Sequence, residues 1–401
     1  MGAAVDQLAR QALSGRLRHD GRGGALDRRN GVCRRCGLPS GTGRVRVDPS
    51  GVCNYCRYWE RHSAGILDVE PRRASLEERF QRFPGRQHHD VLVGLSGGKD
   101  STYVLHRMLS DHSVRLLAVT YDNGFLTPYA HDNVDAIVKA SGVEHRLHRP
   151  NWEALRAFYR ATLLRLGDPC IACAIGGYAL AIKACAEHGV PFFVHGRSPM
   201  QMFRAAYRGS RDPGLVTVRR NLRGYNPQVL RWSYRALGLK FRALLRAIEP
   251  DRSMRRRIFE EFFDVPLSRQ HVVPEFLAYF LFEPYDEEAI KSFLEAQDTG
   301  YRRPALDVPL GHADCLIHDV CSYLYRLRYG VSKVSYEVAT MRRSGRLSAE
   351  EAEEIVKRDK PSEELVEESV GTLLDALDLP RAAFDELTSR LARDRGAHRL
   401  A

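Results

Sequence analysis

The chain has 401 residues, of which 44% are hydrophobic and 28% are charged. This composition is ordinary for a soluble globular protein, and the length predicts two or three domains. No run of about 20 apolar residues occurs and no apolar signal-peptide core is present, so we expect a cytoplasmic protein without membrane insertion. Nine cysteines in that compartment indicate metal or redox chemistry before disulfides.

The net charge of +11 is concentrated in one segment. Residues 201–260 contain 15 Lys and Arg residues against 4 Asp and Glu residues, an excess equal to that of the whole chain. Such a segment is expected to face a polyanionic partner, which would be RNA, a nucleotide-sugar or a membrane surface. A solvated basic helical face explains the same composition without any partner.

Two pairs of cysteines give the first chemical signature along the chain. Cys33-x-x-Cys36 and Cys53-x-x-Cys56 are separated by 16 residues. Each CxxC pair places two thiolates on one ion, and two such pairs complete a tetrahedral shell. These four cysteines are therefore predicted to bind Zn²⁺ in a structural zinc ribbon. Because the shell has no spare ligand position, we expect no catalysis at this metal.

The stretch DVLVGLSGGKDS at 90–101 carries the most informative pattern. Residues 91–95 are nearly all apolar, as in a strand buried on both faces of a parallel sheet, and residues 102–110 have one apolar helical face. A Gly-rich turn between them is an anion site, because backbone N–H groups and the helix dipole both favour phosphate. An ordinary strand-to-helix turn is the alternative. The predicted phosphate-binding residues are Ser96, Gly97, Gly98, Lys99, Asp100 and Ser101.

SGGKDS resembles the PP-loop of the ATP pyrophosphatases, also called adenine nucleotide α-hydrolases. It differs from the common phosphate loop, GxxxxGK[ST], because its two glycines are adjacent. The resemblance implies that ATP is split between its α and β phosphates and that AMP is attached to a substrate oxygen. Lys99 and Asp100 are the catalytic residues expected in the loop, and a carboxylate beside phosphates implies Mg²⁺.

Strands and helices continue to alternate after this unit, which predicts a parallel sheet with right-handed crossovers. Ligands bind at the carboxyl ends of such strands, so Asp122 and Asn123 are placed to meet the adenosine. The resemblance to PP-loop enzymes supports contacts at this strand end and at a Gly-containing turn after the fourth strand. The residues of that turn are Gly196, Arg197 and Ser198. The further strands are predicted at 114–121, 144–148 and 190–195.

A third CxxC pair stands apart from the ribbon. Cys170 and Cys173 lie at the start of a predicted helix that runs to about residue 187, and a thiol at a helix N-terminus has a lowered pKa and is reactive. Three interpretations are open. The two cysteines are a redox or persulfide-carrying pair, or they are two ligands of a [4Fe–4S] cluster or second metal. The third interpretation is a buried pair of small residues. Cys315 is the candidate third ligand. Cys185 and Cys321 are predicted to be core residues.

Residues 341–352, MRRSGRLSAEEA, resemble the C-terminal part of the N-acetyl sugar amidotransferases, which are PP-loop enzymes that also begin with a CxxC…CxxC ribbon. This resemblance implies adenylation of a substrate oxygen followed by substitution with nitrogen, with ammonia from a separate glutaminase. Residues 336–340 lack the polar run of those relatives, so the acceptor is not identified. Nitrogen transfer is the leading interpretation of the sequence.

The chain is also similar to the PP-loop enzymes that thiolate tRNA. They combine a zinc-binding CxxC pair with a further CxxC and a third cysteine, a pattern that Cys170, Cys173 and Cys315 would fit as cluster ligands or persulfide carriers. The alternative function is therefore sulfur transfer to tRNA or to a small metabolite, with a separate sulfur donor protein. A non-enzymatic nucleotide-binding module is the third interpretation. A homodimer is compatible with all three.

The predicted organisation is an α/β fold with a doubly wound parallel sheet of the PP-loop, Rossmann-like type, an N-terminal zinc ribbon and a largely helical C-terminal domain. The expected boundaries are a disordered basic tail at 1–30, the ribbon at 31–60, a linker helix at 61–89, the ATP-binding domain at 90–200, a basic helical insertion at 201–265 and the C-terminal domain at 266–401.

Overall fold

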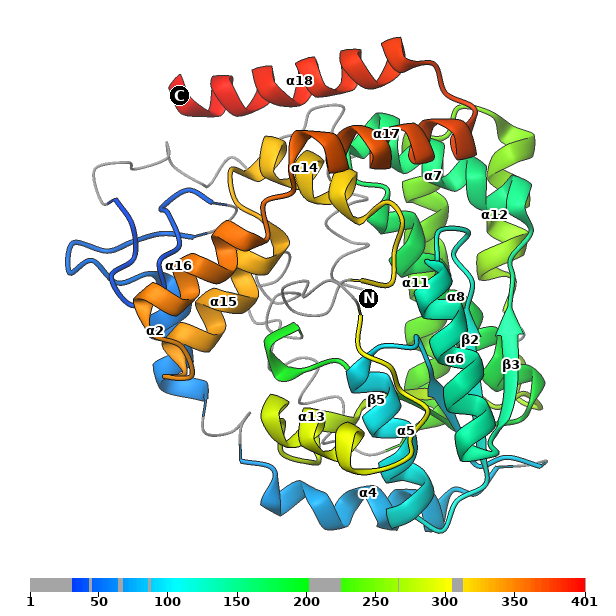
Figure 1. Ribbon diagram of the computed structural model, residues 1–401. Helices are drawn as coiled ribbons and strands as arrows, with labels where there is room; N and C mark the ends of the chain where they lie inside the picture. The colour runs from blue at the N-terminus through cyan, green and yellow to red at the C-terminus, as the bar shows by residue number, and fades with distance from the viewer. Residues whose placement is uncertain are drawn as a thin grey trace.

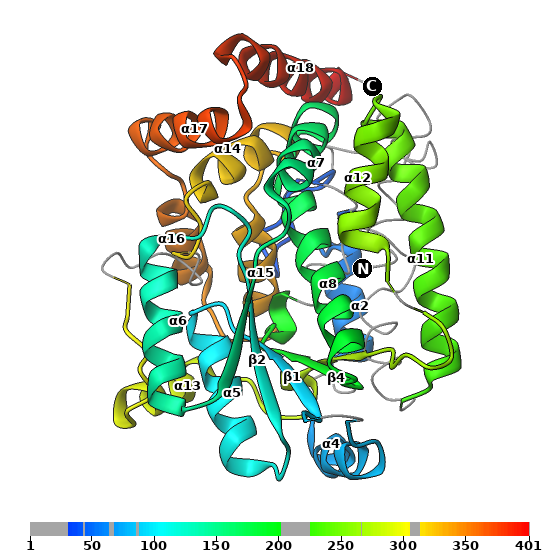
Figure 2. The same cartoon turned by 90° about the vertical axis from the view of Figure 1, so that its right-hand side faces the viewer.

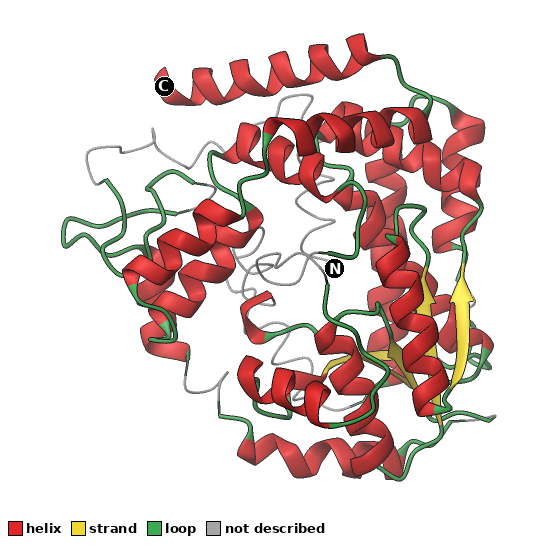
Figure 3. Cartoon of the chain, viewed as in Figure 1, coloured by secondary structure: helices red, strands yellow, loops and turns green. Residues whose placement is uncertain are grey.

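The protein is built around a parallel β-sheet that helices surround, as Figures 1 and 3 show. The predicted tail at 1–30 and residues 202–224 of the predicted basic insertion lie outside the described residues. The computed structural model describes residues 31–42, 45–63, 68–85, 88–201, 225–265, 267–304 and 313–400.

Five strands form the sheet in the order β3-β2-β1-β4-β5, and every neighbouring pair is parallel. This is the order of doubly wound nucleotide-binding folds, in which the chain changes direction beside β1 and leaves a crevice at the carboxyl ends of the strands. The α/β fold class predicted from the sequence is confirmed. The strands are β1 (Val91–Gly94), β2 (Leu116–Tyr121), β3 (Glu144–His148), β4 (Phe192–His195) and β5 (Glu275–Ala278).

β5 lies in the region that the sequence assigned to a largely helical C-terminal domain. It pairs with β4, about 80 residues earlier in the chain, with Phe193 opposite Phe276. A four-residue apolar run is ambiguous between strand and buried helix, so its period alone does not reveal the strand. The sheet therefore draws its last strand from beyond the predicted ATP-binding domain.

Three helices cover the two faces of the sheet: α5 (Lys99–Asp111), α6 (Pro128–Ser141) and α8 (Cys170–Glu187). Val91 and Val93 of β1 face α5 and α6, whereas Leu92 faces Cys185 of α8. Alternate residues of β1 are thus buried on opposite sides, which explains the continuous apolar run of this strand. Among the described helices, α8 alone is long and apolar enough to cross a membrane, and 56% of it is buried within the protein.

A second hydrophobic core lies between helices beside the sheet (Figure 2). Phe158, Phe241 and Phe262 are fully buried in it, with ring centroids of Phe158 and Phe241 5.4 Å apart. The predicted basic insertion is therefore anchored in the body of the protein through its apolar face. The helices are α7 (Trp152–Leu166), α11 (Pro227–Ile248), α12 (Arg252–Phe263), α14 (His318–Tyr329), α17 (Glu363–Leu377) and α18 (Arg381–Leu400).

The N-terminal cysteine segment is joined to the main core rather than set apart from it. Its four cysteines and Trp59 belong to the same hydrophobic cluster as β1, together with Tyr336 and Ala339. Figure 1 shows this segment beside the helices that follow α14. The remaining elements are α2 (Asn54–His62), α4 (Glu70–Arg82), the 3₁₀ turn η2 (Tyr279–Leu281), α13 (Glu287–Ala296), α15 (Lys333–Arg343) and α16 (Ala349–Arg358).

Candidate nucleotide and cysteine sites

The loop between β1 and α5 has the geometry of an anion site. Gly97 has a φ of 77°, and a Cβ on it would lie 2.8 Å from the Ala130 carbonyl oxygen, so glycine is required there. The Ser101 hydroxyl accepts a hydrogen bond from Ser96 N–H at 3.2 Å and donates to the Gly98 carbonyl at 3.0 Å. These bonds fix the turn at the start of α5, where unpaired N–H groups and the helix dipole favour phosphate.

Gly196, at the end of β4, approaches this loop closely. A Cβ on Gly196 would lie 2.8 Å from the Asp100 carbonyl oxygen and 3.2 Å from the Ser101 nitrogen. Ser198 is buried, and its hydroxyl accepts from Gln201 N–H at 3.2 Å. Arg197 instead places its guanidinium 4.9 Å from the ring centroid of Tyr178 on α8. The turn after β4 therefore adjoins the loop through its glycine, while its arginine packs against α8.

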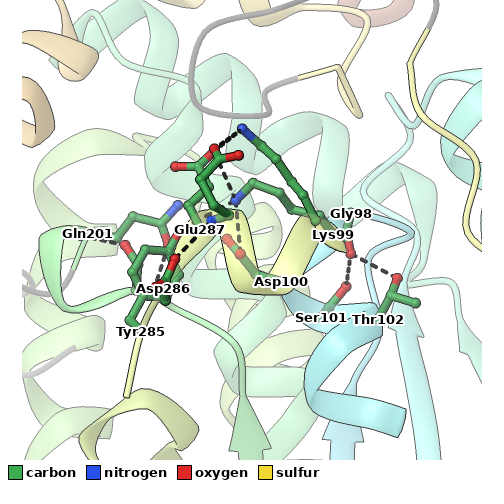
Figure 4. A network of polar contacts seen from close by, with 12 residues as sticks. Gly98, Lys99, Asp100, Ser101, Thr102, Gln201, Tyr285, Asp286 and Glu287 are labelled. Atoms are coloured by element: carbon green, nitrogen blue, oxygen red, sulfur yellow. Dashed lines mark hydrogen bonds and ion pairs between the residues drawn. The ribbon is translucent and has the colours of Figure 1, made fainter. Parts of the chain in front are cut away.

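Lys99 and Asp100 take part in a polar network with α13 and the turn before it (Figure 4). Lys99 Nζ lies 2.9 Å from Asp100 Oδ1, 3.3 Å from the Tyr285 hydroxyl and 3.8 Å from Glu287 Oε1. Burial lowers the pKa of Lys99, but the charges of Asp100, Tyr285 and Glu287 outweigh it and hold the pKa above its usual value. Burial raises the pKa of Asp100, against the effect of Lys99.

Tyr285 and Glu287 were missed by sequence reasoning, which placed this region in a separate domain. The available signal was Asp286, whose side chain caps α13 by accepting from Glu288 and Ala289 N–H groups. A capped helix start marks a turn, but it does not reveal that the turn faces a loop almost 190 residues earlier.

A cavity of about 1690 Å³ adjoins this network. Lys99, Asp100 and Ser198 line it on the sheet side, while Glu337 of α15 and Arg346 line it from the C-terminal region. Pockets for drug-sized ligands are about 300–1,000 Å³, so the cavity has room for a nucleotide and a second substrate.

The two residues at the end of β2 that are predicted to meet the adenosine make contacts within the protein. Asp122 accepts hydrogen bonds from Gly124 N–H at 3.0 Å and from Arg149 Nε at 2.8 Å. Asn123 is buried, and its Nδ2 donates to Cys173 Sγ at 3.3 Å. The Asn123 amide therefore faces the second cysteine group.

Three candidate cysteines converge beside Asn123. Cys170 and Cys173 begin α8, and Cys315 pairs in an antiparallel bridge with Leu126, just beyond the end of β2. Burial raises the pKa of Cys315 well above its usual value, and the charges of Cys170 and Cys173 add to this effect. The fold thus brings together the three cysteines that the sequence analysis grouped.

Cys321 belongs to the same group, although the sequence indicated only a core residue. It is buried on α14 and forms a side-chain hydrogen bond with Cys170. This bond, followed by the charge of Lys333, outweighs burial and lowers the pKa of Cys170 to about 6. Burial raises the pKa of Cys173 to about 11, although the hydrogen bond from Asn123 acts in the opposite direction. The pKa of Cys170 is thus lowered and that of Cys173 is raised, so the two thiols of this pair differ.

The four N-terminal cysteines form a closed group. Cys33 and Cys56 sulfurs are 3.8 Å apart, Cys36 and Cys53 sulfurs are 3.7 Å apart, and all four lie within 4.8 Å of one another. A tetrahedral ion with metal–sulfur bonds of about 2.3 Å requires sulfurs about 3.8 Å apart, so the group fits a zinc-type site. Among the described residues, no other group of three potential ligands is this close. The second cysteine group is therefore not arranged around a single tetrahedral ion.

Known proteins share little with this chain. No family model matches it, and no curated protein matches it. Among solved structures it is similar to the U34-tRNA thiolase NcsA from Methanococcus maripaludis with its [4Fe–4S] cluster, at 16% sequence identity and a TM-score of 0.31, over 81% of this chain and 88% of that chain.

Proposed function

We propose that the protein is an ATP-dependent sulfurtransferase that adenylates a substrate oxygen and then replaces that oxygen with sulfur. The observation that carries this proposal is the convergence of Cys170, Cys173 and Cys315 beside the end of β2. β2 pairs directly with β1, which carries the loop that would hold ATP. Nucleotide and sulfur chemistry would thus share one edge of the sheet.

In the first step, the loop and Lys99 hold the triphosphate, and Asp100 is the residue that would hold Mg²⁺. A substrate oxygen attacks the α phosphorus and pyrophosphate leaves, so the substrate oxygen becomes part of AMP. Lys99 is already buried and charged before ATP arrives, which lets it stabilise the leaving pyrophosphate without large rearrangement. ATP and Mg²⁺ are accordingly the cofactors of this step.

In the second step, sulfur attacks the activated carbon and AMP leaves with the original oxygen. Cys170 is the favoured carrier, because its lowered pKa keeps it a thiolate near neutral pH. A persulfide on Cys170, supplied by a sulfur donor protein, would attack through its outer sulfur. A second cysteine thiolate would then break the S–S bond, releasing the thiolated product and leaving a disulfide for an external thiol to reduce. Alternatively, a [4Fe–4S] cluster held by Cys170, Cys173 and Cys315 would supply the site for sulfide.

Nitrogen transfer is the leading interpretation of the sequence, but no contact among the described residues specifically favours it. Nitrogen transfer has no use for three cysteines beside the end of β2, whereas sulfur transfer uses all of them. The four N-terminal cysteines would bind Zn²⁺ in a structural role in either case.

RNA is the acceptor class that we favour. α11 carries five basic residues and no acidic one, as a phosphate backbone would require: Arg231, Arg235, Lys240, Arg242 and Arg246. Binding to such a surface should weaken steeply as salt rises.

The test is sulfur incorporation by full-length protein purified without oxygen. If a cluster is present, the protein should contain iron and sulfide in addition to zinc. Mass spectrometry should detect thiolated RNA only when ATP is supplied. The amounts of AMP and pyrophosphate released should be equal. Lys99→Met should abolish pyrophosphate release. If AMP release depends on ammonia and no product contains sulfur, sulfur transfer is wrong and the protein transfers nitrogen.

A further inference from the structure

A single helix, α15, extends from one cysteine group to the other. It begins at Lys333 and ends at Arg343. An α-helix rises about 1.5 Å per residue, so its 11 residues span roughly 15 Å. The two groups lie at opposite ends of this helix, and its side chains touch both.

The C-terminal end of α15 lies against the N-terminal cysteine group, which consists of Cys33, Cys36, Cys53 and Cys56. The Nε and Nη2 atoms of Arg343 are fully buried, its Nη1 donates to the Thr340 hydroxyl at 3.0 Å, and the charges of Cys36 and Cys56 help to hold the pKa of its guanidinium above the usual value. The Arg342 guanidinium lies close to the first knuckle, since a Cβ on Gly37 would lie 2.6 Å from its Nη1. Two consecutive arginines therefore lie against the N-terminal cysteine group.

The N-terminal end of α15 lies against the second group. Lys333 Nζ is 3.8 Å from Asp168 Oδ1 and 5.5 Å from the ring centroid of Tyr325. Lys333 also forms a side-chain hydrogen bond with Cys170, and Asp168 accepts from Cys170 N–H at 3.1 Å. Lys333 thus helps to set both the position and the charge of Cys170.

The start and the middle of α15 are held by a cap and by burial. Ser332 and Ser335 form a reciprocal capping box at its start, and Tyr336 and Ala339 are buried in the core that contains the four N-terminal cysteines. Glu337, from the same turns, lines the cavity beside Lys99. A displacement at the end of α15 would therefore move residues at both the cavity and Cys170.

The metal would fix the surface against which the end of α15 packs. Four thiolates on one ion would hold both knuckles at a single point, because each knuckle supplies two of the ligands. Without the metal nothing joins the two knuckles there, since metal binding at such a site contributes folding free energy. Arg342 and Arg343 would then lose the surface that covers them, and the end of α15 would move toward water.

We propose that Arg343 is a positioning residue that couples metal occupancy of the N-terminal cysteine group to the second cysteine group through α15. The metal would hold α15 in place without taking part in the reaction. This inference rests on contacts of α15 and stands whichever group the enzyme transfers.

The first test uses hydrogen exchange on the full-length wild-type protein, with zinc bound and after removal by a chelator. We expect amide exchange across α15 and the first turn of α8 to rise at least tenfold on zinc removal, while α6 and α17 change less than twofold. Faster exchange confined to residues 31–63, with α15 unchanged, would overturn the coupling. Equal acceleration in α6 and α17 would also overturn it, because that result means general unfolding.

The second test compares Arg343→Met, Arg343→Lys and Arg57→Gln. Arg57 is the matched control, because it lies in the same ribbon but pairs with Asp48 at 3.1 Å. We expect zinc release to a chelator to accelerate about tenfold in Arg343→Met, less in Arg343→Lys, and not in Arg57→Gln. Exchange at α15 should rise in the same order with zinc still bound. Unchanged release in both Arg343 variants would refute the proposed role, and the lysine variant keeps the test valid if the methionine variant does not fold.

Discussion

The two cysteine groups of this protein differ in how the chain assembles them. The N-terminal group takes four sulfurs from two short knuckles and brings them within 4.8 Å of one another. The second group takes Cys170 and Cys173 from α8, Cys315 from the segment bridged to Leu126, and Cys321 from α14. One group is closed and local, whereas the other is open and depends on the packing of distant segments.

Under the proposed function, this difference would separate a structural role from a chemical one. A closed tetrahedral shell leaves no position for a substrate, so a metal held there would only stabilise the fold. In the open group the thiols have different pKa values, because Cys321 and Lys333 lower the pKa of Cys170 while burial raises that of Cys173. Because their pKa values differ, one cysteine can act as the nucleophile while another stays protonated. Four cysteines bound to one ion would not have this difference.

The largest effect should come from removing the third cysteine of the open group. Cys315→Ser should lower sulfur transfer at least about 1,000-fold, because a carrier or cluster ligand acts as a unit with its partners. AMP formation should remain within about threefold, since ATP binds at the neighbouring strand. Separate assays of the two half-reactions measure this split. Cys185→Ala, a core change on α8, is the control, and an equal loss of both half-reactions in Cys315→Ser would remove the distinction between the groups.

The closed group should respond through stability instead. Cys36→Ser should lower the free energy of unfolding by at least about 3 kcal/mol, because a structural metal site contributes folding free energy outright. Both half-reactions should then decline together as the folded fraction falls. Denaturant titration with zinc analysis measures the effect. A stable, zinc-free variant with a selective loss of sulfur transfer would reverse the roles assigned to the two groups.

A third change probes the nucleotide loop that the open group adjoins. Gly196→Ala should weaken ATP binding about tenfold, because the new methyl group must displace the Asp100 carbonyl from 2.8 Å. Gly238→Ala is the control, since a Cβ at that position meets no atom within 4 Å. Isothermal titration with ATP compares the two variants. Equal affinities would mean that the loop adapts to the end of β4.

The smallest effect tests the inequality within the open group. Cys321→Ala removes the hydrogen bond that contributes most to the lowered pKa of Cys170, so that pKa should rise from about 6 toward its ordinary value of 9.0. Because thiolate forms as pH rises through the pKa, alkylation of Cys170 at pH 7 should slow about fivefold and recover at higher pH. Mass-spectrometric labelling of iron-free protein across pH measures this shift. An unchanged pH profile of alkylation would mean that Lys333, without Cys321, lowers the pKa of Cys170.

Sequence reasoning succeeded where structure follows from neighbouring residues. The knuckles of Cys33 and Cys53, the loop at 96–101 and the strand at 91–94 are local patterns with a fixed spacing, and each takes the expected form. No spacing along the chain predicts the pairing of Cys315 with the CxxC of α8. Cys315 was the candidate third ligand, whereas Cys185 and Cys321 have the spacing of core residues.

Long-range packing accounts for what the sequence did not reveal. β5 is too short for its period to identify it, and Tyr285 meets Lys99 only because α13 folds back onto α5. Cys321 has the apolar spacing of a core residue, and it is indeed buried, so nothing local marks its contact with Cys170. The adenosine contacts of Asp122 and Asn123 stay predictions. The contacts of these side chains with Arg149 and Cys173 come from other elements, so no local pattern indicates them.

The antiparallel bridge between Leu126 and Cys315 also orders events during synthesis. Ribosomes add about 5–20 residues per second, so the first knuckles can close tens of seconds before residue 315 has emerged. During that interval the end of β2 lacks its partner segment, and Cys170 and Cys173 lack theirs. A nascent chain can therefore close its N-terminal cysteine group early, whereas the second cysteine group can assemble only late in synthesis.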